Sequence, residues 1–308
     1  MTRILITGSA GLLGSALCNK LALSSFEVMK FDINEHTHEP SYGNICSLNS
    51  LMEKIQCCDG IVHFAAVSRV VWGERDPEKC WQVNVEGTRN VLDAAKQSSR
   101  KPWVLFASSR EVYGQQSSFP VTETATCNPM NVYARSKKAA EDLMTEYRKY
   151  DLNTAILRFS NVYGRVNDHI DRVVPAFCRA AAQGQPMRVD GFDNIFDFTH
   201  VDDVAEGVFS AIEQLNDGKL LPTMHFTSGV PTTLLELAQL ANQCGDLNSE
   251  IFSAQERSFD VSRFYGEPSL AFQVLNWAPK ISLANGVGEL VKDFFHFYEN
   301  KILETNAA

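Results

Sequence analysis

A glycine-rich turn near the start of the chain constrains the fold more than any other feature. A short apolar run, Ile4-Leu5-Ile6, stops at Gly8, and a helical apolar pattern begins after Gly11. We expect Gly8 to allow a tight turn, Gly11 to let the backbone approach a pyrophosphate, and Gly14 to let helix and sheet pack closely. The first N–H groups of the helix then face an anion. The pattern predicts a strand–turn–helix unit that binds a dinucleotide.

An acidic residue, Asp32, follows this turn at the end of a second apolar run, residues 26–31. A carboxylate in this place accepts hydrogen bonds from ribose hydroxyls and repels a 2′-phosphate, so it favours NAD over NADP. The alternative is that Asp32 is a turn residue at a strand end. The preceding glycines favour the NAD-binding role.

Composition limits the remaining possibilities. The chain has 308 residues, 44% of them apolar and 21% charged, which suits one large domain or two modest ones. A net charge of −9 speaks against nucleic acid as a partner, and no apolar run reaches the ~20 residues of a membrane span. The first strand is predicted directly at the N-terminus, so we expect no signal peptide. Eight cysteines are scattered along the chain, a pattern that suits neither a disulfide framework nor a zinc site. We expect a cytoplasmic protein that binds no membrane and no metal.

Apolar runs and helical patterns alternate through the first half of the chain. Strands are predicted at residues 61–66, 104–107 and 154–158, and helices at 48–55, at 77–96 and from near Asn131. Such alternation predicts an α/β fold with a Rossmann-type, doubly wound parallel sheet. Small residues at the strand ends, such as Ala65 and Ala66, leave room for a cofactor.

After Gly164 the predicted elements become shorter and more mixed. Helices are expected at 172–182, 204–215, 233–242, 268–274 and 287–298, and strands at 187–189 and 224–226. This pattern predicts a smaller, mixed α/β C-terminal lobe that completes a substrate cleft. We expect the NAD-binding domain to contain residues 1–165 and about 196–222, and the substrate-binding lobe to contain residues 166–195 and 223–308.

Tyr133 and Lys137 are the strongest catalytic candidates. Residues four apart share one face of a helix, so the phenol and the ammonium can meet the same ligand. A free phenol has a pKa near ~10, which is too high for a base at neutral pH. We expect the lysine and the positive nicotinamide of an oxidised cofactor to lower this pKa. Ser109 would hold or relay the proton of a substrate alcohol. The structural alternative is a surface tyrosine and lysine on an amphipathic helix.

Together these patterns resemble a known family. Over nearly its whole length the chain is similar to the extended short-chain dehydrogenase/reductases, and within them to the NAD-dependent sugar epimerase/dehydratase group. The motifs that carry the resemblance are Thr7-Gly8-Ser9-Ala10-Gly11-Leu12-Leu13-Gly14, His63-Phe64-Ala65-Ala66, Asn84-Val85-Glu86-Gly87-Thr88, Ser108-Ser109-Arg110-Glu111-Val112-Tyr113-Gly114, Tyr133 with Lys137, Arg158-Phe159-Ser160-Asn161-Val162-Tyr163-Gly164 and Asp197-Phe198-Thr199-His200-Val201-Asp202-Asp203-Val204.

The resemblance implies roles for individual residues. Tyr133 would be the catalytic base, Lys137 would tune it and hold the nicotinamide ribose, and Ser109 would be its partner. Asn161 would contact a nucleotide-sugar diphosphate, and Asn44-Ile45 would lie near the adenine. The expected cofactor-binding residues are Gly8, Gly11, Leu12, Leu13, Gly14, Asp32, Asn44, Ile45, Phe64, Ala65, Ala66, Asn84, Ala107, Tyr133, Lys137 and Phe159.

One departure from the group's pattern concerns the reaction. The 4,6-dehydratases of this group carry an Asp-Glu pair where this chain has Arg110-Glu111. Elimination of water needs a proton donor, and an arginine, always charged, donates protons poorly. Arg110 therefore favours epimerisation over dehydration, and Glu111 is kept as a catalytic candidate. The structural alternative is an ion pair of Glu111 with Arg110 or with a neighbouring helix.

A second departure concerns the substrate. The group usually has an arginine that clamps the diphosphate where this chain has Phe196. Arg257 lies in a stretch that resembles the group's other phosphate-binding arginine and is the first candidate to replace it. Arg172, Arg188 and Arg263 are further candidates, although each of the four could be an ordinary surface arginine. A modified nucleotide sugar, or a sugar without a nucleotide, is left open.

The sequence favours an NAD-dependent enzyme that inverts C4 of a nucleotide-activated hexose through a transient 4-keto sugar. The alternatives are a nucleotide-sugar 4,6-dehydratase that uses Glu111, an NAD-dependent sugar dehydrogenase, and a non-catalytic NAD-sensing or scaffold protein. The last has no need of Ser109, Tyr133 and Lys137, which are all present. By resemblance alone we expect a homodimer formed through the helices at 77–96 and 131–150.

Overall fold

The centre of the protein is an all-parallel, six-stranded sheet with the strand order β10-β5-β4-β3-β1-β2. The computed structural model describes residues 2–33, 42–255 and 259–306. The predicted Rossmann-type parallel sheet is confirmed. Its strands are β1 (Arg3–Thr7), β2 (Glu27–Phe31), β3 (Gly60–His63), β4 (Trp103–Ser109), β5 (Thr154–Phe159) and β10 (Met224–Phe226).

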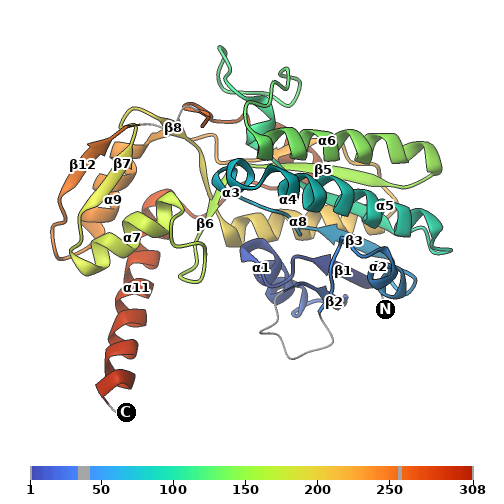
Figure 1. Cartoon of the computed structure of the whole chain (residues 1–308), viewed down its shortest axis with the longest axis horizontal. Coiled ribbons are helices and arrows are strands. Elements are labelled where there is room, and N and C mark those ends of the chain that lie inside the picture. The colour runs from blue at the N-terminus through green and yellow to red at the C-terminus, as the bar shows by residue number, and fades with distance from the viewer. Residues whose placement is uncertain (1, 34–41, 256–258, 307–308) are drawn as a thin grey trace.

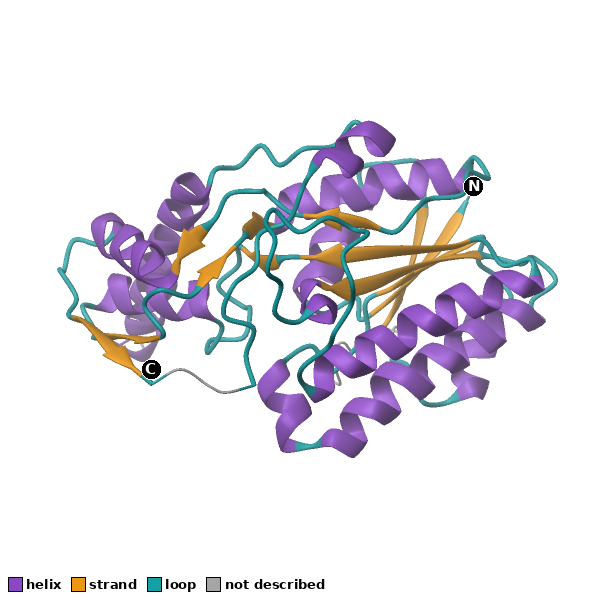
Figure 2. Ribbon diagram, turned by 90° about the horizontal axis from the view of Figure 1, so that it is seen from above, coloured by secondary structure: helices purple, strands orange, loops and turns teal. Residues whose placement is uncertain are grey.

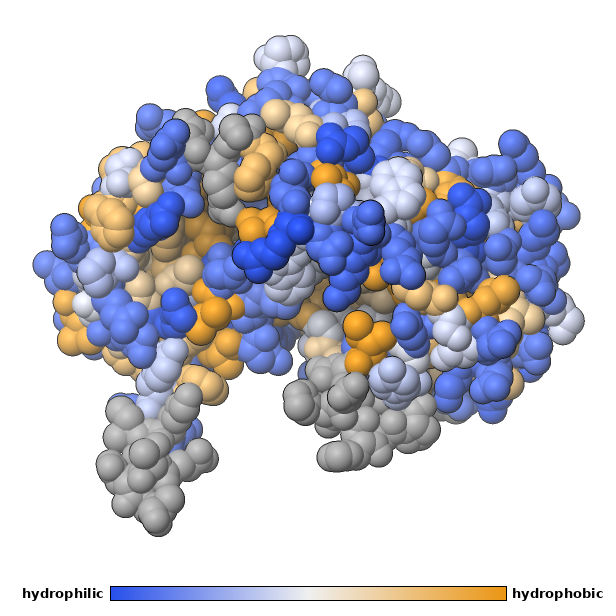
Figure 3. Space-filling view, viewed as in Figure 1, coloured by the Kyte–Doolittle hydropathy of each residue, from blue (hydrophilic) through white to orange (hydrophobic). Residues whose placement is uncertain are grey.

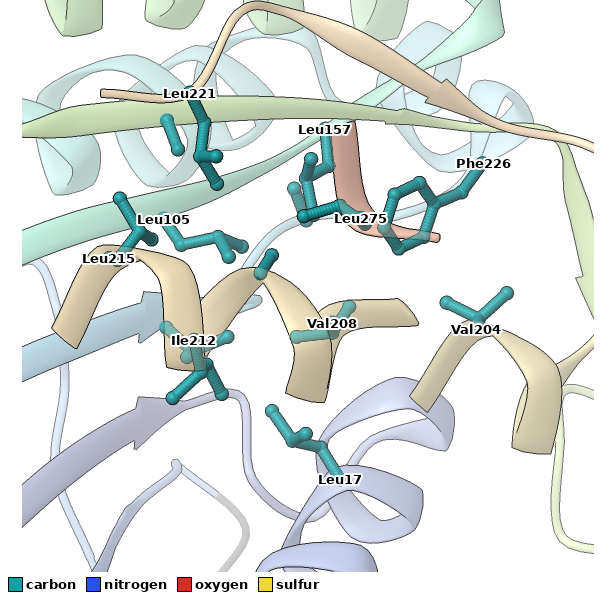
Figure 4. Close-up of a cluster of buried hydrophobic side chains, with 14 of the residues drawn as sticks. Leu17, Leu105, Leu157, Val204, Val208, Ile212, Leu215, Leu221, Phe226 and Leu275 are labelled. Carbon is teal, nitrogen blue, oxygen red and sulfur yellow. The ribbon is translucent and has the colours of Figure 1, made fainter. Parts of the chain in front are cut away.

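Helices cover both faces of this sheet (Figures 1 and 2). Because both faces are covered, β3, β4 and β5 are continuous apolar runs rather than alternating ones. On one face, Leu17 and Val208 pack with Leu105 and Leu157 of the sheet in a single buried cluster (Figure 4). That face carries α1 (Leu12–Leu21), α8 (Val201–Asn216) and α10 (Ser269–Leu275), and the other carries α2 (Leu48–Ile55), α5 (Gly87–Gln97) and α6 (Val132–Tyr147).

Helix starts follow from local capping. The side chain of Asn131 accepts a hydrogen bond from the Ala134 N–H at 2.8 Å and so begins α6, which carries the catalytic candidates. The prediction of one continuous helix at 77–96 is wrong in one respect. It consists of α4 (Pro77–Trp81), a π-helical turn η1 (Gln82–Glu86) and α5, because the side chain of Asn84 inserts between neighbouring segments. The remaining short helical segments are α3 (Val70–Arg75), η2 (Arg110–Tyr113) and η3 (Arg148–Tyr150).

A second lobe packs beside the sheet, at the left of Figure 1. It contains three two-stranded ladders, β6 with β9, β7 with β12 and β8 with β11. Its core is a cluster that includes Phe177, Leu237, Leu290 and Phe294. The elements are β6 (Asn161–Tyr163), β7 (Met187–Asp190), β8 (Ile195–Phe196), β9 (Phe198–His200), β11 (Thr232–Thr233), β12 (Ile251–Ala254), α7 (Val173–Gln183), α9 (Leu234–Cys244) and α11 (Leu283–Asn306).

Two elements of the C-terminal part return to the main sheet. Strand β10 pairs with β5 at its edge, and α10 contributes Ala271 and Leu275 to the core beneath it. Both lie in the segment 223–308 that the sequence assigns to the substrate-binding lobe. We therefore propose that the NAD-binding domain also includes β10 and α10.

Candidate functional site

A cavity of about 800 Å³ lies between the carboxyl ends of the central strands and the second lobe. On the face shown in Figure 3, the surface is hollowed between the two lobes. The glycine turn after β1 lines one end of the cavity, and residues of the second lobe such as Arg188 and Phe196 line the other. Within the described ranges, the predicted site residues line this cavity, apart from Asn84 and Arg263.

Gly8 and Gly14 have no room for a side chain. Gly8 has a φ of +72°, and a Cβ built on it would lie 2.6 Å from the backbone nitrogen of Ala65. A Cβ on Gly14 would lie 2.1 Å from the carbonyl oxygen of Gly8, so only glycine lets α1 pack at this distance. Gly11 precedes α1 and brings no side chain that could cap its first N–H groups. This turn forms an anion cradle at a helix N-terminus.

Asp32 connects the end of β2 to this cradle. One of its carboxylate oxygens accepts a hydrogen bond from the backbone N–H of Ala10 at 2.9 Å. Asn44 and Ile45 line the same end of the cavity. A glycine cradle, a carboxylate beside it and a cavity that continues to the ends of β4 and β5 together fit a dinucleotide.

A buried histidine fixes the strands beneath the cradle. His63, at the end of β3, contacts the Thr7 hydroxyl through Nδ1 at 2.7 Å and the Thr88 hydroxyl through Nε2 at 3.0 Å. Burial, aided by the charge of Lys137, lowers the pKa of His63 to about 3, so the ring is neutral. The histidine therefore positions β1, β3 and α5 and carries no charge to the site.

Asn84, predicted to bind the cofactor, acts on the loop after β3 instead. Its side chain accepts from the N–H of Val67 at 2.8 Å and donates to the carbonyl of Val67 at 3.1 Å and to the Ser136 hydroxyl at 2.9 Å. Asn84 does not line the cavity. The π-helical turn directs it toward Val67, which nothing in the local sequence indicates.

The three catalytic candidates come together inside the cavity. Ser109 ends β4, whereas Tyr133 and Lys137 lie in the first turns of α6. The Ser109 hydroxyl lies close enough to the Tyr133 phenol to lower the pKa of Tyr133 by hydrogen bonding. Lys137 donates from Nζ to the Ala107 carbonyl at 2.8 Å, and Nζ lies 6.0 Å from the centre of the Tyr133 ring. All three therefore line the same cavity.

The charge on Tyr133 differs from the expectation. Burial raises its pKa to about 12, and this outweighs the opposing effects of the Ser109 hydrogen bond and the Arg172 charge. The ammonium of Lys137 donates to the Ala107 carbonyl, and burial lowers the pKa of Lys137 itself to about 8. The protein groups alone thus leave Tyr133 protonated at neutral pH.

Glu111 is held by two donors at the edge of the site. Oε1 lies 2.9 Å from Nη2 of Arg110, and Oε2 accepts from Nδ2 of Asn131 at 3.1 Å. The ion pair that the sequence left as the alternative role of Glu111 is therefore present. It would have to be broken before Glu111 could carry a proton.

The glycine cradle and the Ser109–Tyr133–Lys137 group agree with one family model, the NAD dependent epimerase/dehydratase family, which matches residues 4–222. The chain belongs to this family. The resemblance stated from the motifs is confirmed, and so is the NAD-dependent class.

Known relatives of this epimerase/dehydratase chain differ in their reactions. UDP-glucuronic acid decarboxylase 4 of Arabidopsis thaliana is 30% identical over 312 residues, which cover 95% of this chain and 68% of that protein. UDP-glucose 4-epimerase of Mycolicibacterium smegmatis is 30% identical over 320 residues, which cover 97% of this chain and 99% of that protein. A solved structure of UDP-glucose 4-epimerase from Thermotoga maritima with UDP-glucose has a TM-score of 0.90 at 24% identity and covers 96% of this chain and 100% of that one.

Two of the arginines predicted as phosphate ligands line the cavity of this family member. Arg172 lies at the start of α7, where its Nε is 3.6 Å from a carboxylate oxygen of Asp168. Arg188 lies on β7 and pairs with Asp190 at 2.9 Å.

A third candidate, Arg263, lies elsewhere. Arg263 stacks on Phe119, with its guanidinium carbon 4.7 Å from the ring centre, and does not line the cavity. Arg257 lies outside the described residues.

Contacts between the two lobes border the same cavity. No sequence motif predicted them. Arg69 forms an ion pair with Asp171, and the rings of Trp72 and His169 meet edge to face at 4.6 Å between centroids. Each pair joins α3 and its N-terminal flank to the loop before α7. Residues so far apart in sequence share no local pattern that would have found them.

Neither a membrane span nor a metal cluster is found in the part of the chain that the structure describes. No helix there is long and apolar enough to cross a bilayer. No group of three or more His, Cys, Asp or Glu side chains there is arranged to hold a metal ion. All eight cysteines are free.

Proposed function

We propose that this chain is an NAD-dependent epimerase that inverts C4 of a nucleotide-activated hexose. The juxtaposition of Ser109 and Tyr133 in the cavity carries this proposal. The pair lies beside Lys137 in a cavity whose far end is the glycine cradle. An alcohol bound against this pair meets a fixed hydroxyl and a proton acceptor together.

In the proposed reaction Ser109 holds the C4 hydroxyl and Tyr133 takes its proton. The pKa of Tyr133, raised to about 12 by burial, makes it a poor base in the protein alone. When bound, NAD would supply the positive charge that lowers this pKa, accept the C4 hydride and return it to the opposite face of the 4-keto sugar. Tyr133 then gives its proton back to the C4 oxygen. Lys137, anchored on Ala107, is placed to hold the nicotinamide ribose.

Dehydration is less well supported by the geometry. A 4,6-elimination needs a group that protonates the departing hydroxyl, and Glu111 is the acid nearest to this role. Its two oxygens are engaged by Arg110 and Asn131. Giving up a buried ion pair is costly, so this arrangement favours a reaction that leaves Glu111 in place.

A second candidate is oxidative decarboxylation of a nucleotide-activated uronic acid. It is favoured by the 30% identity to UDP-glucuronic acid decarboxylase 4 of Arabidopsis thaliana. It would use the same removal of the C4 hydroxyl proton by Tyr133, with bound NAD supplying the oxidant, after which the resulting β-keto acid loses carbon dioxide. The two candidates therefore share the site and differ in product.

We also propose that the enzyme is cytoplasmic and homodimeric. The helical segments expected to pair include α4, η1 and α5 on one side and α6 and η3 on the other. Trp81 and Tyr150 on these segments are large apolar side chains that are 44% and 40% exposed. Measuring the mass of the protein in solution tests the dimer.

A substrate panel tests the proposed function. Purified protein is incubated with UDP-, dTDP-, GDP- and CDP-hexoses and with UDP-glucuronate, and products are identified by proton NMR while NADH absorbance is followed. A C4 epimer without net NADH is the expected result. A pentose with carbon dioxide would establish the second candidate. A 4-keto-6-deoxy sugar, steady NADH growth, or no turnover would contradict both.

A further inference from the structure

The two positions at which this chain departs from its family's pattern lie in contact. The guanidinium carbon of Arg110, on the turn after β4, is 4.6 Å from the centre of the Phe196 ring and 5.9 Å from that of Phe264. Stacking of a guanidinium on an aromatic face is attractive and fixes the plane of the cation. Phe196 thus replaces one cation and also supports another.

Arg110 is a buried cation at the wall of the cavity. It is 8% exposed and lines the cavity together with Glu111 and Asn161. Its Nη2 is shared between Glu111, at 2.9 Å, and the side-chain oxygen of Asn161, at 3.5 Å. Its Nη1 is buried and makes no hydrogen bond with any residue in the described ranges. A buried donor without a partner is costly, so a small shift of the guanidinium that gives this N–H an acceptor is favourable.

The other cations that line the cavity are already engaged elsewhere. Lys137 is bonded to the Ala107 carbonyl, and Arg69 is paired with Asp171. Arg172 faces Asp168 and Arg188 faces Asp190, with the Arg188 side chain 64% exposed. Within the described residues, Arg110 is thus the cation of the cavity that is buried, contacts Asn161 and has a nitrogen without a hydrogen-bond partner.

We propose that Arg110 binds a phosphate oxygen of the substrate, from the turn after β4, in place of a cation at position 196. This rests on the proposed function, because the phosphate is that of a nucleotide sugar. Phe196 holds the guanidinium against Asn161, and Glu111 neutralises it until the phosphate arrives. The phosphate and Glu111 then compete for the same cation, so replacing Arg110 and replacing Glu111 have opposite effects on phosphate binding.

Direct titration of the NAD-loaded protein with UDP, dTDP, GDP and CDP, and with UDP-glucuronate, tests this without turnover. In Arg110→Gln the best-bound nucleotide should bind about 10- to 100-fold more weakly, the loss expected for a charged hydrogen bond. In Glu111→Gln it should bind at least as tightly as in the wild type. Phe196→Arg placed in the Arg110→Gln background should recover most of the loss. Arg100→Gln, which removes an exposed cation outside the cavity, is the matched control and should change binding less than about threefold.

Each other result overturns the inference in a recognisable way. Wild-type affinity in Arg110→Gln shows that Arg110 is not a ligand. If Arg110→Gln weakens the binding of UDP-glucuronate and leaves that of UDP unchanged, Arg110 binds a sugar carboxylate and not the phosphate. Loss of NAD content or of folding in Arg110→Gln without recovery by Phe196→Arg shows a structural role. If the wild type itself binds none of the nucleoside diphosphates, the proposed function falls together with the inference.

Discussion

Replacing Glu141 should destabilise the fold through the buried charge that it leaves behind. Glu141 lies one helical turn beyond Lys137 on α6 and is 3% exposed. It accepts hydrogen bonds from Arg158 at 2.8 and 2.7 Å and from the Ser108 hydroxyl at 2.5 Å. Without it, the guanidinium of Arg158 stays buried without its counter-charge.

The size of the effect follows from this geometry. Breaking a buried ion pair by removing one partner costs about 3–5 kcal/mol. Glu141→Gln, which keeps the volume and removes the charge, should lower the free energy of unfolding by this amount. Replacing both members, as in Glu141→Leu with Arg158→Met, leaves no buried charge. The double variant should therefore lose at least about 3 kcal/mol less than the sum of its single variants.

Urea unfolding followed by fluorescence of the four tryptophans measures these differences. Asp142→Asn is the matched control on the same helix, because the Asp142–Lys138 pair is exposed and should contribute less than about 1 kcal/mol. A cost below about 1 kcal/mol for Glu141→Gln would refute the reasoning. So would a double variant as unstable as the sum of the single ones.

Three further predictions follow from the site and its surroundings. Tyr133→Phe should reduce turnover by at least about 100-fold while NAD stays bound, as measured by product formation and cofactor content; near-normal turnover would remove Tyr133 as the base. Gly14→Ala should abolish NAD retention, because its Cβ would lie 2.1 Å from the Gly8 carbonyl oxygen, and protein that retains NAD would contradict the cradle. Burial lowers the pKa of both His63 and His225 to about 3. Because the unfolded chain takes up these protons near pH ~6.5, the free energy of unfolding should fall as pH drops from about 6.5 toward 3, with a smaller slope in His63→Asn. Urea midpoints at several pH values test this, and an unchanged slope in the variant would contradict it.

Local sequence signals were enough for the cofactor end of the site. The glycines at positions 8, 11 and 14 have their effect within a single turn, so their spacing alone predicts the cradle. Tyr133 and Lys137 lie four apart on one helix, and their common face follows from helix geometry. These predictions needed no knowledge of how distant segments meet.

The features of the fold and the site that the sequence did not predict depend on tertiary contacts. Strand β10 has three residues, too few to show a period, and its place at the edge of the sheet depends on pairing with β5. The stacking of Arg110 on Phe196 joins two departures that look unrelated in the sequence. The raised pKa of Tyr133 comes from burial, which residue spacing does not report.

The most direct test of the proposed epimerase is the fate of the hydrogen on C4. The nucleotide sugar that the panel identifies is prepared with deuterium at C4, and the product is examined by NMR after one and after many turnovers. We expect the deuterium to stay on C4 of the inverted sugar, with no loss to solvent and no net reduced cofactor. Loss of the label to water, or inversion at another carbon, would contradict transfer from C4 against Ser109 and Tyr133.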